Sequence, residues 1–148
     1  MSARPLELVP LTAAQRMGMG GSLAIRSETD VRMMVFQVQA YAASLGFTAV
    51  GATQLATGAS ELAMNILKYA GEGEVRWHTV QQGLRQGMEL QARDKGPGIP
   101  DLAKALEEHY SSKGTLGLGL PGTRRLMDEF WIDSEPRKGT RVCVRKWK

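Results

Sequence analysis

The fold of this 148-residue chain can be read outward from one stretch, QARDKGPGIP at residues 91–100. In an extended strand, successive side chains point to opposite faces. Asp94 therefore shares a face with the apolar residues before it, Met88, Leu90 and Ala92. A carboxylate on an apolar face is unfavourable unless a protein or ligand donor hydrogen-bonds to it. Gly96 and Gly98 then break the strand and let backbone approach closely. The stretch predicts a pocket with a single buried acid.

Taken alone, this pattern also describes an acid that opens an ordinary Gly-Pro turn. Two further stretches decide between these interpretations: ELAMN at residues 61–65 lies in a helical pattern, and GTLGLG at 114–119 opens a helix after a polar loop. In this order, the three stretches resemble the N box and the two glycine boxes of the GHKL ATP-binding superfamily. Four segments are most similar to the RsbT-type serine/threonine switch kinases of bacterial stress signalling: 65–71, 94–106, 117–122 and 125–130.

The resemblance, which covers roughly residues 22–147, implies a protein serine/threonine kinase that uses ATP and Mg²⁺. It implies three kinds of partner: a STAS-domain antagonist that is phosphorylated, STAS-domain scaffold proteins of the stressosome, and a PP2C-type phosphatase that is activated by binding. Related alternatives are an anti-sigma factor kinase that sequesters a sigma factor, and a nucleotide-sensing module without phosphotransfer. A histidine kinase is disfavoured, because the chain shows no helical hairpin with a phospho-acceptor histidine.

Residue by residue, the resemblance assigns Mg²⁺ binding to Asn65 and the role of catalytic base to Glu61. The two are four positions apart, so they project from the same helix face. Asn is a poor helix former in mid-helix, which argues against an incidental position. Gly58 and Lys68 continue this polar strip, and Lys68 is a candidate contact to the nucleotide.

The resemblance implies that Asp94 accepts the adenine amino group, with Gly96 and Gly98 making room for the ring. Thr140 resembles the residue that holds adenine from the far side, although a strand-favouring Thr is an equal alternative. Candidate contacts to the phosphates are Lys113, Gly117 and Gly119. The glycines also match the dinucleotide fingerprint, but a loop precedes them where a Rossmann unit needs a strand. The interpretation that remains is a glycine-lined helix N-terminus, whose free N–H groups favour binding of a phosphate.

Hydrophobic periodicity predicts an α+β fold: a two-layer α/β sandwich with about three main helices on one face of a mixed, mostly antiparallel sheet. The GHKL (Bergerat) fold implied by the resemblance agrees. Helices are expected over residues 28–45, 49–69, 101–109 and 121–130, and strands over 22–27, 74–81, 87–94, 131–135 and 140–147. Residues 82–86 are expected to form a hairpin loop, and residues 110–115 a mobile loop. Residues 1–21 are predicted to be a flexible N-terminal extension to one ATP-binding domain over 22–148.

The composition is that of a globular protein, with 43% hydrophobic and 23% charged residues. The single cysteine, Cys143, excludes an internal disulfide and favours the cytoplasm; no signal peptide or membrane span is expected. Much of the net charge of +4 lies in a basic cluster at the chain end: Arg137, Lys138, Arg141, Arg145, Lys146 and Lys148. Only Trp147 is interleaved with them, so we expect a solvated strand face or an acidic partner's docking face and no nucleic acid.

Overall fold

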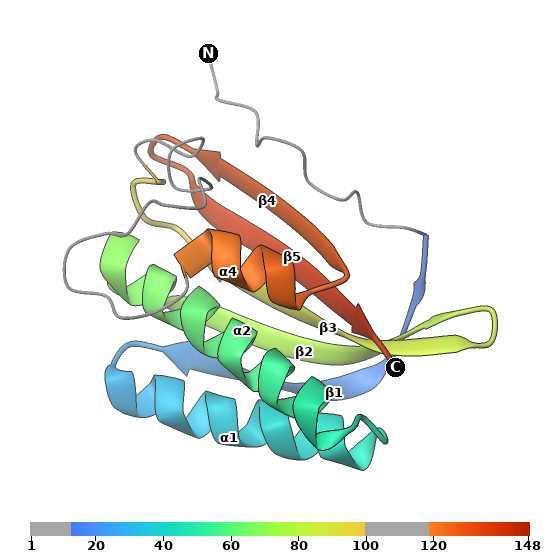
Figure 1. The fold of residues 1–148 in the computed structure, drawn as a ribbon. Helices are drawn as coiled ribbons and strands as arrows, with labels where there is room; N and C mark the ends of the chain where they lie inside the picture. Colours follow the sequence, from blue (N-terminus) through green and yellow to red (C-terminus); the bar gives the residue numbers. More distant parts are fainter. Residues whose placement is uncertain (1–12, 100–118) are drawn as a thin grey trace.

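The computed structural model describes residues 13–99 and 119–148, which form a five-stranded sheet with helices on one face (Figure 1). The sheet order is β1-β2-β3-β5-β4, and every pairing among the described strands is antiparallel. The strands are β1 Gln15–Ile25, β2 Gly73–Gln82, β3 Arg85–Asp94, β4 Glu129–Glu135 and β5 Gly139–Trp147. The predicted α+β sandwich is confirmed, with no parallel pair in the described part of the sheet.

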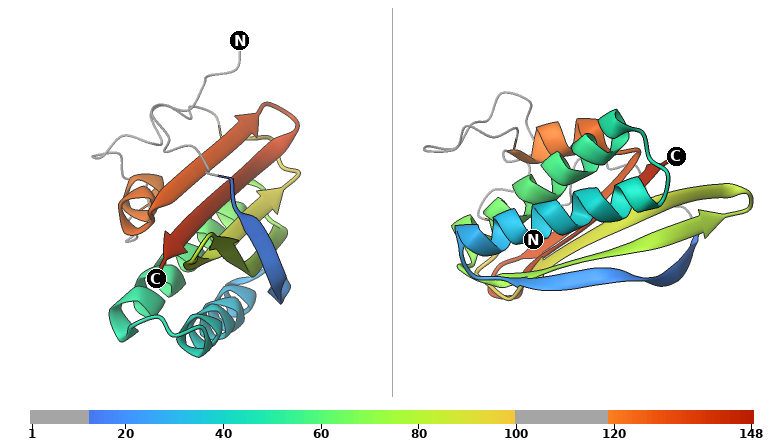
Figure 2. Two further views of the ribbon diagram at one scale, coloured as in Figure 1. Left: turned by 90° about the vertical axis from the view of Figure 1, so that its right-hand side faces the viewer. Right: turned by 90° about the horizontal axis from the view of Figure 1, so that it is seen from below.

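The described helices, α1 Glu28–Ser44, α2 Ala49–Tyr69 and α4 Gly119–Leu126, all lie on the same face of the sheet (Figure 2). Ser27 caps α1, since its hydroxyl accepts a bond from the Asp30 N–H at 3.3 Å. Gly46, with a φ of 93°, ends that helix in the left-handed region. One stripe of α2 is buried, as the spacing of its apolar residues favours: Leu55, Ala59, Leu62, Ala63 and Ile66. These side chains form the core with the inward faces of the strands.

Among the boundaries that differ from those predicted, three show the effect of strand pairing. β1 begins at Gln15, well before Ser22, and pairs with β2 as far as Gln81. The β2–β3 hairpin closes with Gln82 opposite Arg85, so its turn is shorter than the predicted loop. α4 ends at Leu126, before Phe130, because the Asp128 N–H bonds to the Arg145 carbonyl and starts the pairing of β4 with β5. In each case strand pairing sets the boundary: it lengthens β1, β2 and β3 and ends α4 early.

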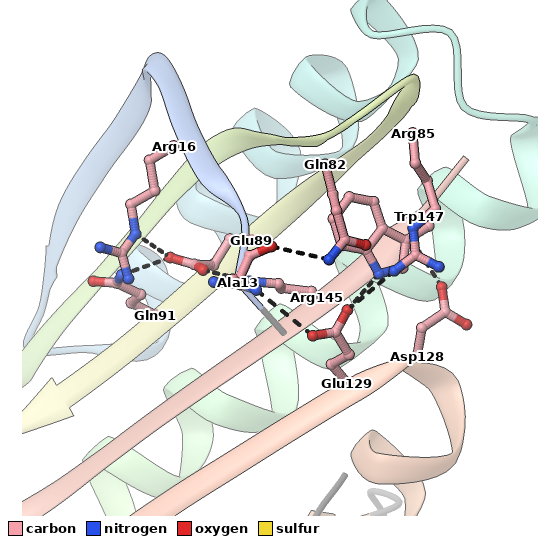
Figure 3. Close-up of polar contacts among 10 residues, drawn as sticks. All are labelled: Ala13, Arg16, Gln82, Arg85, Glu89, Gln91, Asp128, Glu129, Arg145 and Trp147. Carbon is pink, nitrogen blue, oxygen red and sulfur yellow. Dashed lines mark hydrogen bonds and ion pairs between the residues drawn. The ribbon is translucent and has the colours of Figure 1, made fainter. Parts of the chain in front are cut away.

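The sheet face away from the helices holds a second buried acid, Glu89, which the sequence analysis did not single out. Its carboxylate lies between Arg16 Nε at 2.6 Å and Arg145 Nε at 2.7 Å (Figure 3). Gln91 Nε2 donates a further bond at 2.7 Å. Burial raises the pKa of Glu89, but the bonds from Arg16, Arg145 and Gln91 outweigh it, so the pKa lies below the ordinary value. Glu89 is thus a second acid of β3, on the face opposite to the predicted Asp94 pocket.

The basic cluster at the chain end is largely engaged by the fold. Arg145 is buried and pairs with Glu89 and Glu129, so it belongs to no solvated face. The ammonium groups of Lys146 and Lys148 donate to the carbonyls of Leu126 and Leu45, where they satisfy helix ends. Lys138 and Arg141 pair with acids of β4. Most of these cations are therefore already bonded within the protein and are less available to a partner.

We predict that Glu89→Ala destabilises the protein by about 3 kcal/mol, because the buried Arg145 would lose the carboxylate that it contacts at 2.7 Å. Arg16→Gln should cost less than about 1 kcal/mol, since the Arg16 side chain is half exposed. Urea unfolding of both variants measures the difference. Because the folded pKa of Glu89 is lowered, its contribution should be complete above the ordinary value of 4.5 and decline as the pH falls below it. Equal destabilisation by the two substitutions would contradict this account.

Candidate functional site

Asp94 is the last residue of β3, where the strand meets the Gly-Pro loop. It faces Thr140 of β5 across the sheet, and its Oδ1 accepts the Gly96 N–H at 2.9 Å. Burial raises the pKa of Asp94; the backbone N–H groups of Gly96 and Thr140 lower it but compensate only in part, so the pKa stays above the ordinary value. The protein thus holds a partly desolvated carboxylate that a further donor would stabilise.

The loop glycines allow close packing around Asp94. A Cβ on Gly96 would lie 2.5 Å from the Cβ of Ala70, at the end of α2. A Cβ on Gly98, whose φ is 86°, would lie 2.6 Å from the carbonyl oxygen of Glu135. Larger residues at either position would push the loop off its neighbours. A role of these glycines in making room for an adenine ring remains a prediction.

Ser134, on the core face of β4, fixes the same loop and was missed by the sequence analysis. Its hydroxyl accepts the Ile99 N–H at 2.8 Å and lies 2.8 Å from Thr140 Oγ1. Thr140 is itself buried, so its hydroxyl belongs to this bonded pair as well as to a strand. The sequence could have indicated Ser134, because side chains of a strand alternate between its faces. Ser134 follows Phe130 and Ile132 at every second position, on the buried face of β4. A small polar residue on such a face needs a specific partner.

The polar strip of α2 lies on the helical side of the site. Asn65 is half buried, and its Nδ2 atom has no hydrogen-bond partner among the described residues. A buried amide without a partner is unfavourable, so the site suits a ligand with complementary polar atoms. Since the two ends of an amide are assigned from their bonds, the same position can present the side-chain oxygen to a cation. The arrangement fits the predicted nucleotide and Mg²⁺ contact.

Glu61 lies one helical turn before Asn65, at the start of α4. Its Oε2 accepts the Gly119 N–H at 3.1 Å. Gly119 has a φ of 65°, which its lack of a side chain allows, and Thr123 Oγ1 bonds back to its carbonyl at 3.0 Å. The structure therefore brings together a carboxylate, a carboxamide and the first turn of a glycine-started helix.

The remaining predicted site residues are not all placed at this junction. Lys68 is exposed, with its ammonium 4.9 Å from the ring centre of Tyr69. Lys113 and Gly117 lie outside the described residues, as do the predicted helix 101–109 and the predicted mobile loop 110–115. Gly58 does not continue the polar strip: it is buried, and a Cβ there would lie 2.5 Å from Met127 Cε of the segment after α4. Its absent side chain lets α2 and that segment pack closely.

Asp94 also borders a cavity of about 350 Å³ at the open end of β1, β2 and β3. This cavity is lined by charged strand-end residues, among them Arg26, Glu72, Arg93 and Lys95. Neither Glu61 nor Asn65 lines it, so it lies apart from the α2–α4 junction. Within the described residues, no group of His, Cys, Asp and Glu could hold a metal ion by itself. Any Mg²⁺ here would share its coordination with phosphate and water, as this ion usually does.

The other titratable candidates are structural. Cys143 is buried on β5, and burial, with Glu89 close by, raises its pKa to about 12. Such a thiol is not a reactive nucleophile at neutral pH. Burial lowers the pKa of His78, which keeps it neutral on the outer sheet face. No described helix is long and apolar enough to cross a membrane.

Comparison with known proteins shows the same fold family. Residues 25–146 match the histidine kinase-like ATPase domain. The chain is 44% identical to the serine/threonine-protein kinase RsbT of Bacillus subtilis over 106 residues, which are 72% of this chain and 80% of that protein. It is 33% identical to the anti-sigma F factor of Halalkalibacterium halodurans, over 74% of this chain and 78% of that one. The anti-sigma F factor of Shouchella clausii is 31% identical, over 90% of this chain and 92% of its own. The predicted resemblance to GHKL proteins and RsbT-type kinases is confirmed.

We predict that Asp94→Ala lowers ATP affinity by about ten- to a hundredfold, because it removes a hydrogen bond to a charged group worth roughly 1.5–3 kcal/mol. Titration calorimetry measures the change. The matched control is Asp133→Ala, which removes a partly exposed carboxylate paired with Arg141 on the outer sheet face and should keep wild-type affinity. Unchanged ATP affinity in a folded Asp94→Ala protein would show that Asp94 does not bind the nucleotide.

Proposed function

This chain belongs to the histidine kinase-like ATPase family, and we propose that within it the chain is an ATP-dependent protein serine/threonine kinase that regulates partners in bacterial stress signalling. The observation that carries the proposal is the α2–α4 junction. There, Glu61 lies at the first turn of α4, one helical turn from the unpartnered amide of Asn65. A pure nucleotide sensor would need Asn65 and Asp94 but has no use for a positioned base.

In the proposed reaction, Glu61 takes the proton of a partner's serine or threonine hydroxyl. The hydroxyl oxygen then bonds to the γ-phosphorus of ATP, and the bond from that phosphorus to the oxygen of the departing ADP breaks. Asn65 would hold Mg²⁺, which supplies charge neutralisation on the phosphates. The bond from Gly119 N–H fixes the Glu61 carboxylate, and the neighbouring N–H groups of α4 suit a phosphate oxygen.

Asp94 would bind the adenine amino group, which supplies the donor that its burial calls for. Gly96, Gly98 and Thr140 would shape that end of the pocket. Lys68, Lys113, Gly117 and Gly119 are proposed contacts to the phosphates. The order along the chain, with Glu61 and Asn65 on α2 and Asp94 at the end of β3, places base and adenine contacts on separate elements. Changes in transfer and in nucleotide binding should therefore be separable by mutation.

The proposed partners follow from the similarity to RsbT: a STAS-domain antagonist as the phosphorylated substrate, STAS-domain scaffold proteins, and a PP2C-type phosphatase activated by binding. We place the protein in the cytoplasm, where a single unpaired cysteine stays reduced. The second candidate is an anti-sigma factor that also phosphorylates its antagonist, which the similarity to two anti-sigma F factors supports. Pull-down with purified sigma factor and purified STAS protein distinguishes the two, since only the second candidate should retain the sigma factor.

We predict that Glu61→Gln loses about 10²- to 10⁴-fold in phosphoryl transfer to a STAS protein while ATP affinity stays within a few-fold. The amide can keep the contact to Gly119 but cannot accept the proton, so the substitution separates the base from the positioning of α4. Transfer is followed with labelled ATP. Glu28→Gln, an exposed acid on α1, is the matched control and should react at the wild-type rate.

Asn65→Ala should behave differently, with a loss of transfer together with magnesium-dependent ATP affinity, because metal and triphosphate bind as one unit. Calorimetry with and without Mg²⁺ measures this coupling. A Glu61→Gln protein that phosphorylates its partner at the wild-type rate would rule out the carboxylate as base. Loss of magnesium dependence in Glu61→Gln but not in Asn65→Ala would reverse the assigned roles.

A further inference from the structure

The sheet face away from the helices carries a groove of about 340 Å³ that takes no part in the proposed reaction. Its lining comes from β1, β3, β5 and β4, and its principal side chains are Arg16, Gln91, Arg93, Trp131, Arg141 and Cys143. The described helices all cover the opposite face, so they leave this one open (Figure 2). Three guanidinium groups line the groove, and none of its lining residues is acidic. Arg16 and Arg141 already pair with Glu89 and Asp133, so Arg93 is the lining cation that leaves positive charge for an anionic ligand.

Two of these arginines face each other in register. Arg93 of β3 is paired with Arg141 of β5, and like charges directly opposite in an antiparallel pair are destabilising. Arg141 is compensated by Asp133 at 3.0 Å and lies 5.5 Å from the ring centre of Trp131. These contacts hold its guanidinium group beside the aromatic ring.

Arg93 has no such compensation. Its other cross-strand neighbour is Glu74 of β2, but the Glu74 carboxylate already bonds to Arg76 at 2.6 Å. The side chain of Arg93 is exposed and makes no hydrogen bond or ion pair within residues 13–99 and 119–148. The fold thus keeps an uncompensated cation next to a second one, at a cost in stability that an external carboxylate would offset.

We propose that this groove docks a carboxylate-rich segment of a protein partner, with Arg93 and Arg141 as its carboxylate-binding residues. A guanidinium group can bind a carboxylate through two parallel N–H bonds, which gives strength and orientation. Trp131 adds a flat apolar surface against which the segment packs. A single aromatic residue is too few for a base-stacking platform, so a protein segment is favoured over single-stranded nucleic acid. Arg16 adds positive charge at the β1 side while it remains bonded to Glu89.

The groove lies on the sheet face away from Glu61 and Asn65, although Arg93 also lines the cavity that Asp94 borders. Adjacent residues of a strand point to opposite faces, so Asp94 faces the helices and Arg93 faces the groove. Glu61 and Asn65 lie in the helical layer. Docking here therefore does not depend on the proposed kinase reaction, and a partner could occupy the groove with or without nucleotide.

The test uses the full chain and a fluorescently labelled Glu-Ser repeat peptide, with a Gln-Ser repeat peptide as the uncharged probe. We expect the acidic peptide to bind by anisotropy, more weakly at high salt, and the uncharged one not to bind. Arg93→Gln should weaken binding roughly tenfold, and Arg93→Lys should retain most of it because charge remains. The matched control is Arg32→Gln on α1, an exposed arginine of the helical layer, which should bind as wild type. Thermal unfolding of each variant checks the fold.

Four outcomes would overturn the proposal. The acidic peptide could fail to bind, or could bind equally to wild type, Arg93→Gln and Arg32→Gln. A poly-uridine RNA could bind more tightly than the peptide and be lost in Arg93→Gln, which would make the groove a nucleic-acid site. A dimer seen by sedimentation could dissociate in Arg93→Gln, which would make a second copy of the chain the occupant. Because no assay here uses ATP, these results are independent of the tests of kinase activity.

Discussion

Strand β3 carries an acid on each of its faces, and the rest of the structure depends on satisfying both. Asp94 faces the helices and accepts backbone N–H groups that compensate its burial only in part. Glu89 faces away from them, and two arginines and a glutamine satisfy it. Because Glu89 is fully hydrogen-bonded and Asp94 only partly, Glu89 has a structural role and Asp94 can accept a bond from a ligand. Glu89 links β1, β3 and β5 into one sheet, whereas Asp94 keeps capacity for a further donor.

The helical layer and the sheet come into contact at the Gly-Pro loop that follows β3. Gly96 lies against Ala70 at the end of α2, and Ser134 binds the loop to β4 and β5. These contacts give Asp94 a fixed position relative to the helix that carries Asn65. One helical turn before Asn65, the bond between Glu61 and Gly119 fixes the start of α4. The proposed nucleotide site thus draws on three separated segments, each of which makes hydrogen bonds to backbone.

The same division between the two sheet faces underlies the two binding surfaces proposed for this chain. The helical layer and the strand ends carry the residues that are proposed to bind ATP. The sheet face away from the described helices carries arginines whose charge is only partly compensated within the protein. Arg145 forms ion pairs with Glu89 and Glu129. Arg141 forms an ion pair with Asp133 and lies over the ring of Trp131. Arg93 alone among these three has no described partner. The charged groups that have no partner within the described fold therefore indicate where each surface would bind a ligand.

The sequence by itself determined the helices α1 and α2, the two ends of α1 at Ser27 and Gly46, and the position of Asp94 at the end of a strand. These features depend on periodicity and short-range backbone preferences. It also determined the family, since the ordered motifs are local. Only the tertiary structure decided the full length of β1, the end of α4 at Leu126, and the burial of Glu89, Arg145 and Ser134. Those features arise from pairing between strands distant in sequence. A charged residue such as Arg145 looks solvated until the partner that compensates it is brought beside it.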